Sequence, residues 1–275
     1  MSNPRTAARL WNRRQLLRVF SAGNMALTLN GHEQFTLGLG TYTFRSLDIE
    51  ALIERCRQLG LRTIELSHPQ YMLPQAKLET FSPAREKLRA GGIDLVSWYC
   101  GHLSKRSEIE SLAEGVRLFG VKTVSGSAER ELLDEIDGAA GKSGFAFGIH
   151  NHYFANRKFT YESPEDVLSA VKGHANIFAT LDTGHMIAVG VDPTEAYRKL
   201  KAYVRIIHLK DEDTPGHGVI MGKGNGNMAQ FLKTILRDGF QGLGAIEFEE
   251  GKDPVREVAE CVSFIRNQMQ WERYP

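Results

Sequence analysis

The feature that most constrains the fold is a series of short apolar runs separated by amphipathic segments. Eight such runs follow residue 36, and their starts lie roughly 30 residues apart, about the length of a strand, a helix and their turns. They are residues 37–44, 62–67, 93–100, 122–127, 145–152, 177–183, 204–211 and 243–250. Strands that alternate with helices favour a parallel sheet with right-handed crossovers. Eight is also the number of strands that closes a (β/α)8 barrel.

The segments between the runs have the spacing of amphipathic helices. Between residues 49 and 59 apolar side chains recur every three or four positions, Asp48 can cap the first turn, and Gly60 can end the helix. The same periodicity occupies residues 112–119 and 255–269. No Gly-x-Gly-x-x-Gly sequence follows the first run, as a dinucleotide-binding open sheet would require. The pattern therefore favours the barrel.

Length and composition are consistent with one α/β domain. The 275 residues suit a single TIM barrel as well as two small domains. A net charge of +1 gives no electrostatic support for a nucleic-acid partner. No apolar run approaches the ~20 residues of a membrane span, so stable membrane insertion is not expected. The three cysteines are far apart, which excludes a disulfide framework or a zinc ribbon. We predict a (β/α)8 TIM barrel over residues 36–275. The sequence does not determine the oligomeric state, and a homo-oligomer is one possibility.

Residues 1–35 form a basic N-terminal extension. They contain five arginines against one acidic residue, a balance of +4 that leaves −3 for the rest of the chain. Arg13 and Arg14 precede a short apolar stretch and resemble a twin-arginine export signal. A basic tail or an amphipathic surface helix is the alternative. The expected location is the cytoplasm, or outside it if the signal works.

Four consecutive runs each begin with small or apolar residues and end with a polar side chain on the same face of the strand. The four side chains are His150, Asp182, His208 and Glu247. Active sites of TIM barrels lie at these carboxyl ends. Two imidazoles and two carboxylates suit Mn²⁺, with Zn²⁺, Co²⁺ or Fe²⁺ as alternatives, better than Mg²⁺ or Ca²⁺. The alternative to metal binding for Asp182 is a structural role as the N-cap of the helix that follows.

Such a cation would act on adjacent oxygens of a polyol or hydroxy-ketone. As a Lewis acid it would stabilise an enediolate formed by removal of a proton beside the carbonyl. The pattern therefore predicts one divalent metal ion and a small carbohydrate substrate.

Six short motifs together resemble a known family. They are Ile-Glu-Leu (64–66), His-Asn-His (150–152), Asp-Thr-Gly-His (182–185), His-Leu-Lys-Asp (208–211), Gly-Lys-Gly-Asn (222–225) and Ile-Glu-Phe-Glu (246–249). Over residues 36–270 the chain resembles the sugar phosphate isomerase/epimerase group of xylose isomerase-like TIM barrels. That group includes psicose 3-epimerases, inosose dehydratase and, more distantly, endonuclease IV. The resemblance implies the same metal ligands, a substrate contact by His185, and an acid/base role for Glu247.

One position departs from the epimerases of this group. Their fifth strand typically ends Glu-Asn-His, and its glutamate is both a ligand and one of two opposed proton-transfer groups. Here the residue is His150, and the His-Asn-His motif resembles that of a subgroup that includes 3-keto-glycoside lyases. Proton transfer by Glu247 then needs a different partner, for which His152 is the candidate.

Further candidates surround these ligands. We expect substrate contacts from Glu65, His102, Lys210 and His217, and hydrogen bonds that orient the ligands from Asp211 and Glu249. A hydrogen bond that orients a metal ligand, or a salt bridge, is the alternative role for Glu65.

These residues predict a metal-dependent isomerase or epimerase of a sugar or keto-sugar. A keto-sugar lyase or dehydratase on the same metal is the alternative. An endonuclease IV-like activity is disfavoured by the acidic body, and a non-catalytic sugar-binding barrel is a fourth reading.

Overall fold

A computed structural model describes residues 35–249 and 251–271. The predicted basic extension and its twin-arginine-like segment lie outside these residues, apart from Phe35. Among the described residues, no helix combines the length and apolarity that crossing a membrane would require.

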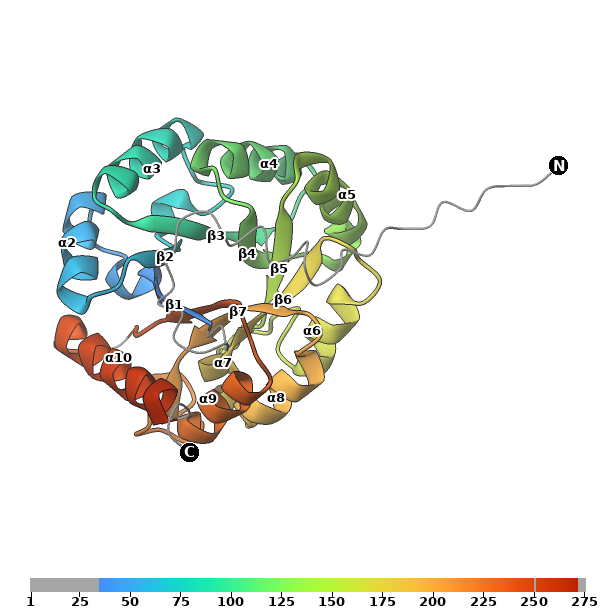
Figure 1. Ribbon diagram of the computed structural model, residues 1–275. Coiled ribbons are helices and arrows are strands. Elements are labelled where there is room, and N and C mark those ends of the chain that lie inside the picture. The colour runs from blue at the N-terminus through green and yellow to red at the C-terminus, as the bar shows by residue number, and fades with distance from the viewer. Residues whose placement is uncertain (1–34, 250, 272–275) are drawn as a thin grey trace. The chain divides into compact units, whose positions relative to one another are not determined.

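Eight parallel strands close a barrel in the order β1-β10-β7-β6-β5-β4-β3-β2 (Figure 1). The strands are β1 (Thr36–Gly40), β2 (Thr63–Leu66), β3 (Asp94–Leu103), β4 (Thr123–Ala128), β5 (Ala146–His150), β6 (Ile177–Asp182), β7 (Val204–Leu209) and β10 (Leu243–Ile246). Each lies within or across one of the eight predicted runs. The prediction of a (β/α)8 TIM barrel is confirmed.

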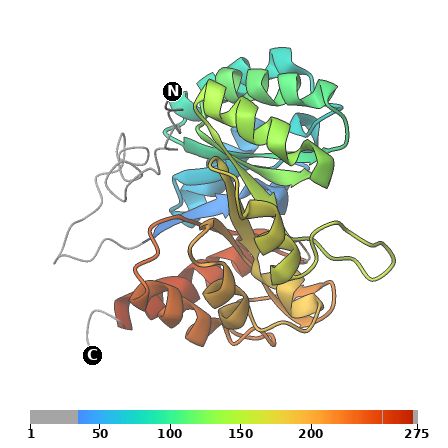
Figure 2. The same cartoon turned by 90° about the vertical axis from the view of Figure 1, so that its right-hand side faces the viewer.

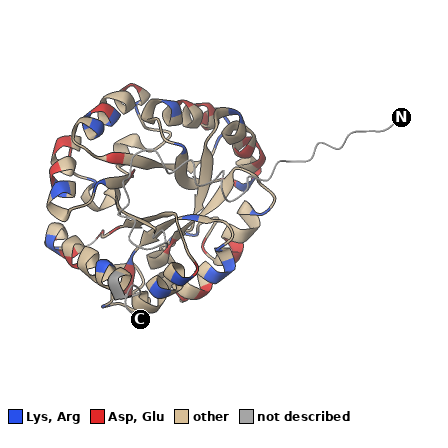
Figure 3. Ribbon diagram, in the orientation of Figure 1, with Lys and Arg blue, Asp and Glu red and all other residues tan. Residues whose placement is uncertain are grey.

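Helices surround the barrel and carry most of the charged side chains (Figures 1 and 3). They are α2 (Ile49–Leu59), α3 (Phe81–Ala90), α4 (Ser107–Phe119), α5 (Leu133–Ser143), α6 (Pro164–Val171), α7 (Thr183–Ala188), α8 (Pro193–Leu200), α9 (Met228–Arg237) and α10 (Pro254–Trp271). Short 3-10 helices occupy Thr41–Phe44, Pro69–Tyr71, Leu78–Thr80 and Arg130–Leu132.

The predicted signals at the ends of α2 are present. The Asp48 carboxylate accepts a hydrogen bond from Ala51 N at 2.8 Å and caps the first turn. Gly60 ends the helix with φ of 63°, a left-handed conformation that favours glycine. Local sequence therefore sets the bounds of this helix.

Two apolar clusters form the core. The larger one lies between the strands and the helices, and it includes the three free cysteines, Cys56, Cys100 and Cys261. The smaller one consists of Ala146, Phe178, Ile206, Leu243 and Ala245, with Val96 against it. Along each strand these residues alternate with residues of the larger cluster, which face the helices. The smaller cluster therefore fills the barrel interior below the carboxyl ends of the strands. They form the floor of the candidate site.

A hairpin follows β7 and precedes the glycine-rich motif at residues 222–225. It consists of β8 (Asp211–Thr214) and β9 (His217–Val219), paired antiparallel. The segment between β5 and α6 also extends beyond the barrel (Figure 2). Both segments contribute residues to the cavity described below.

Candidate metal centre

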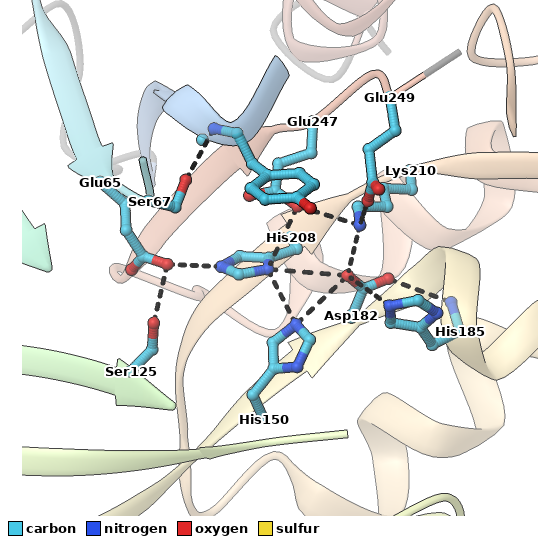
Figure 4. Close-up of polar contacts among 12 residues, drawn as sticks. Glu65, Ser67, Ser125, His150, Asp182, His185, His208, Lys210, Glu247 and Glu249 are labelled. Atoms are coloured by element: carbon cyan, nitrogen blue, oxygen red, sulfur yellow. Dashed lines mark hydrogen bonds and ion pairs between the residues drawn. The ribbon is translucent and has the colours of Figure 1, made fainter. Parts of the chain in front are cut away.

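Four neighbouring strands bring the four predicted ligands together. His150 ends β5, Asp182 ends β6, His208 lies near the end of β7, and Glu247 directly follows β10. Asp182 pairs in register with His208 on the adjacent strand. None of the four is more than 6% exposed, and their side chains point toward one another (Figure 4). Residues 26 to 97 positions apart along the chain thus share one buried centre.

The facing atoms are spaced as the ligands of a single ion would be. His150 Nε2 lies 3.1 Å from His208 Nδ1 and 3.3 Å from Asp182 Oδ2. His208 Nδ1 lies 3.6 Å from Asp182 Oδ2 and from Glu247 Oε2. Two ligands bound to one cation at about 2.0–2.2 Å are roughly 3.0–3.5 Å apart. Asp182 Oδ2 is also buried without accepting a hydrogen bond. These residues therefore fit a divalent cation.

Asp182 is placed both to bind a cation and to cap a helix. Its Oδ1 accepts a hydrogen bond from His185 N at 3.0 Å and caps α7, while Oδ2 faces the centre. Asn151, the middle residue of the His-Asn-His motif, ties the ends of β5 and β6 together. Its side chain donates to Asp182 O at 3.0 Å and accepts from Asp182 N at 2.8 Å. The sequence indicated no role for Asn151.

Glu65 orients His208 from the opposite side. Its Oε1 accepts hydrogen bonds from His208 Nε2 and from Ser125 Oγ, both at 2.7 Å. This leaves His208 Nδ1 facing the centre. Burial opposes a charge on His208, but the carboxylates of Glu247 and Glu65 raise its pKa well above the ordinary value. A cation bound at Nδ1 would displace that proton. The position of Glu65 is that of an orienting residue, whereas substrate contact was its predicted role.

Lys210 places a positive charge beside the acidic ligands. Its Nζ lies 3.1 Å from Asp182 Oδ2 and 3.0 Å from Glu247 Oε2, and it also pairs with Glu249. Burial would lower the pKa of Lys210, but these carboxylates raise it well above the usual value. Burial likewise opposes the charge of Asp182, yet Lys210 and then His185 hold the pKa of that carboxyl well below its usual range. Glu249 thus contacts Lys210, whereas the sequence predicted that it would orient a metal ligand.

A cavity opens above this centre. Its lining residues are Tyr153, Phe154, His185, Lys210, Asp211, Glu212, Gly216, Gly218, Glu247, Phe248 and Glu249. They come from the β5–α6 segment, from α7, from the β8–β9 hairpin and from the end of β10. Lys210, Glu247 and Glu249 form its charged wall.

Two further histidines lie next to the ligands. His185 lines the cavity, and burial lowers its pKa to about 3. His152, predicted as an acid/base, has its ring centroid 4.2 Å from that of His185. Burial, together with the neighbouring His185, also lowers the pKa of His152. Both imidazoles are therefore uncharged near neutral pH and can accept a hydrogen bond or bind a cation.

Two predicted substrate residues, His102 and His217, lie apart from the lining of this cavity. His102 is half-buried and contacts Ser127 Oγ at 2.9 Å and Glu129 Oε1 at 3.1 Å. His217 is exposed on the hairpin and pairs with Asp213 at 2.6 Å. Asp211 does line the cavity, but its carboxylate accepts backbone hydrogen bonds from the three glycines at positions 222, 224 and 226. It therefore orients the glycine loop and not a ligand side chain.

Glu212 is a cavity residue that the sequence did not reveal. It is 5% exposed, and its Oε2 accepts a hydrogen bond from Gly216 N at 2.9 Å. Burial raises the pKa of Glu212 to about 7. The hairpin that carries it has no alternating pattern, so only the run of acidic residues 211–213 could have pointed to it.

The model of the xylose isomerase-like TIM barrel family matches residues 123–268, more than half of the chain. The chain belongs to this family. The predicted resemblance is thereby confirmed for the xylose isomerase-like barrels, and the matched region contains all four candidate ligands.

Individual known proteins are similar to the chain at 13–28% identity. Inosose dehydratase from Clostridium botulinum is 28% identical over 119 residues, which are 42% of this chain and 38% of the relative. The chain thus matches less than half of that relative's length. The structure of 3-keto-D-glucoside 4-epimerase from E. coli has a TM-score of 0.69 at 13% identity, over 85% of this chain and 100% of the other. D-psicose 3-epimerase from Clostridium cellulolyticum has a TM-score of 0.68 at 15% identity, over 86% and 99%. These names agree with the prediction of an enzyme.

Proposed function

We propose that the chain is a divalent-metal-dependent enzyme that isomerises or epimerises a sugar or keto-sugar by moving a proton beside a carbonyl. The observation that carries this proposal is the mixed set of imidazole nitrogens and carboxylate oxygens, 3.1–3.6 Å apart below a polar cavity. His150, Asp182, His208 and Glu247 would hold the cation. When bound, it would supply Lewis-acid polarisation of neighbouring carbonyl and hydroxyl oxygens.

The chain's own residues divide the remaining tasks. Glu247 lines the cavity and is the proposed proton acceptor. Lys210, whose Nζ lies 3.0 Å from Glu247 Oε2, pairs with that carboxylate and faces negative charge that develops on a substrate oxygen. His185, at the cavity wall, is proposed to form a hydrogen bond with a substrate hydroxyl. Phe154 and Phe248 cover the apolar side of a small substrate.

A dehydratase is the second candidate, and Glu212 favours it. Elimination breaks a C–H bond beside the carbonyl and a C–O bond one carbon further, forms a C=C bond and releases water. The leaving hydroxyl needs a proton, which a carboxyl with a pKa of about 7 can donate. Part of the chain is similar to inosose dehydratase, an enzyme named for a dehydration.

Both functions can be tested in one experiment. Metal-loaded protein with Mn²⁺ or Co²⁺ is incubated in D₂O with ketoses, 3-keto-glycosides and inososes, and the products are followed by proton NMR. Loss of a C–H signal without a new alkene signal supports isomerisation, and a vinyl proton supports dehydration. We expect Glu247→Gln to abolish both signals and the exposed variant Glu110→Gln to retain them. Saturable sugar binding without exchange would contradict an enzyme and favour a binding barrel.

A further inference from the structure

Three imidazoles gather beside the centre just described. His150 ends β5, His152 follows it by two residues, and His185 lies in the first turn of α7. Their ring centroids are 5.5 Å apart for His150 and His152, 5.8 Å for His150 and His185, and 4.2 Å for His152 and His185. One ring nitrogen of each lies within 4.8 Å of the other two. Figure 4 shows His150 and His185 near the same oxygen of Asp182.

Two of these rings have a buried nitrogen that makes no hydrogen bond. They are Nδ1 of His150 and Nε2 of His185, whose side chains are 4% and 8% exposed. The nearest acidic atom to His185 Nε2, Asp182 Oδ2, lies 3.9 Å away, which is too long for a hydrogen bond. A ligating histidine usually donates its second ring N–H to a carboxylate or a carbonyl. His150 has no such partner among the described residues.

Two histidines elsewhere in the described part of the chain, His68 and His174, have a partner at each ring nitrogen. His68 contacts Thr41 Oγ1 and Phe44 O, both at 3.0 Å, through its two ring nitrogens. His174 contacts Ala170 O at 2.8 Å and Asp134 Oδ1 at 3.2 Å. Leaving a buried polar atom unpaired costs about 1–3 kcal/mol. The open nitrogens of His150 and His185 therefore indicate that a ligand satisfies them.

The surroundings favour a cation that prefers nitrogen ligands. Three imidazole nitrogens within 4.8 Å of one another offer neutral ligands of the kind that metal ions bind. The ring of Phe159 lies 4.5 Å from that of His152, and the ring of Phe154 lies 4.9 Å from it. These apolar rings shield the cluster on one side. Imidazole ligands suit Zn²⁺, Ni²⁺ and Cu²⁺.

We propose that His150, His152 and His185 form a second divalent-cation site, selective for a borderline cation such as Zn²⁺. It lies beside the first centre and shares His150 with it, so that Nε2 serves the first cation and Nδ1 the second. Binding at both nitrogens releases the remaining ring proton of His150 to solvent. The carboxylate of Asp182, whose Oδ2 lies 3.3 Å from His150 Nε2 and 3.9 Å from His185 Nε2, compensates the added positive charge.

Zinc stoichiometry tests this site without an activity assay. Full-length protein without a histidine tag is dialysed to equilibrium against ZnCl₂ near neutral pH, and bound zinc is measured by mass spectrometry. We expect two zinc ions per wild-type chain and one in each of His152→Ala and His185→Gln. His174→Ala, a matched control on the outer surface, should retain two. Thermal unfolding verifies that every variant is folded, and the visible absorption of bound Co²⁺ gives a second measure of the loss.

The outcomes separate this inference from the proposed function. A single zinc that Glu247→Gln removes and His152→Ala retains would overturn the second site and leave the first centre standing. Two ions that survive the double change of His152 and His185, or an ion lost in His174→Ala, would overturn it as well. Absence of bound zinc in the wild type would contradict both centres.

Discussion

At the scale of single residues, the centre depends on side chains whose two polar atoms have separate contacts. Asp182 caps α7 with Oδ1 and presents Oδ2 to the centre. His208 donates from Nε2 to Glu65 and presents Nδ1. In both cases the first contact fixes the rotamer, so the second atom is already oriented for a ligand. Preorganisation of this kind lowers the entropic cost of binding.

Glu65→Gln tests whether this orientation matters. The glutamine keeps the size of the side chain but loses the charge that holds the His208 proton on Nε2. We expect the affinity for Mn²⁺ or Zn²⁺ to fall roughly 10–100-fold, as is typical for residues that orient ligands. Titration calorimetry measures the change, and Glu86→Gln, on the exposed face of α3, is the control. An unchanged affinity would show that Glu65 has no orienting role.

Glu212→Gln tests the buried carboxyl of the cavity through pH. The folded chain holds the pKa of Glu212 near 7, because burial raises it above the 4.5 of an exposed glutamate. Between these values the folded state binds more protons than the unfolded state, so this group's contribution to stability is lost as pH rises from about 4.5 through 7. The glutamine variant lacks that loss. Relative to wild type it should gain on the order of 1 kcal/mol between pH 4.5 and pH 8.

Urea unfolding at several pH values measures this difference in free energy. Glu110→Gln, on an exposed turn of α4, should show no comparable gain. A difference between Glu212→Gln and wild type that does not change with pH would contradict the raised pKa.

At the scale of elements, the β8–β9 hairpin and the glycine loop after it act as one unit. The buried carboxylate of Asp211, the first residue of the hairpin, accepts N–H groups from Gly222, Gly224 and Gly226 at 2.9–3.1 Å. Asn225 N also donates to Glu212 O at 2.7 Å. The loop is thereby held against the strand that follows β7 and supports the cavity wall.

Gly224→Ala should break this unit. A methyl group at position 224 would overlap the Asp211 carboxylate and lie 2.5 Å from Glu212 O, which belongs to the backbone and cannot easily move. We expect a loss of about 1–3 kcal/mol in the free energy of unfolding. Gly218→Ala, in the same hairpin with nothing within 4 Å of the added carbon, is the matched control and should be close to neutral. Equal losses in both variants would mean that the loop contacts are not responsible.

Sequence predicted the barrel well because its signals are local. Alternation along each strand identified Ala146, Phe178 and Ile206 as interior residues, and the structure places them in the inner cluster. The same alternation placed His150 and His208 at the centre. The hairpin and Glu212 were not predicted, because their environment is formed by residues that the turn of the hairpin brings back against the first strand. The orienting contact of Glu65 likewise joins residues 143 positions apart, which no local pattern encodes.

At the scale of the whole molecule, the barrel brings together charges that would repel one another in isolation. Asp182, Glu247 and Glu249 lie around the single ammonium of Lys210, while Glu65 faces a protonated His208. Only the closed order of strands places the ends of β2, β6, β7 and β10 around one axis. A cation bound there contacts several of these strands at once. It should therefore stabilise the whole barrel and not one loop.

Metal removal tests this coupling between the centre and the fold. A cation that binds only the folded chain adds about 2.7 kcal/mol at a concentration 100 times its Kd. For a domain of this size that corresponds to a rise in Tm of about 5–10 °C. Chelator-treated protein should show this rise when Mn²⁺ or Zn²⁺ is restored, as measured by calorimetry. Asp182→Asn removes the charge of a carboxylate that lies within 4 Å of four neighbouring side chains, and it should lose most of the rise, whereas His174→Ala should keep it. The same Tm with and without metal, or the full rise in Asp182→Asn, would show that no cation is bound where these strands converge.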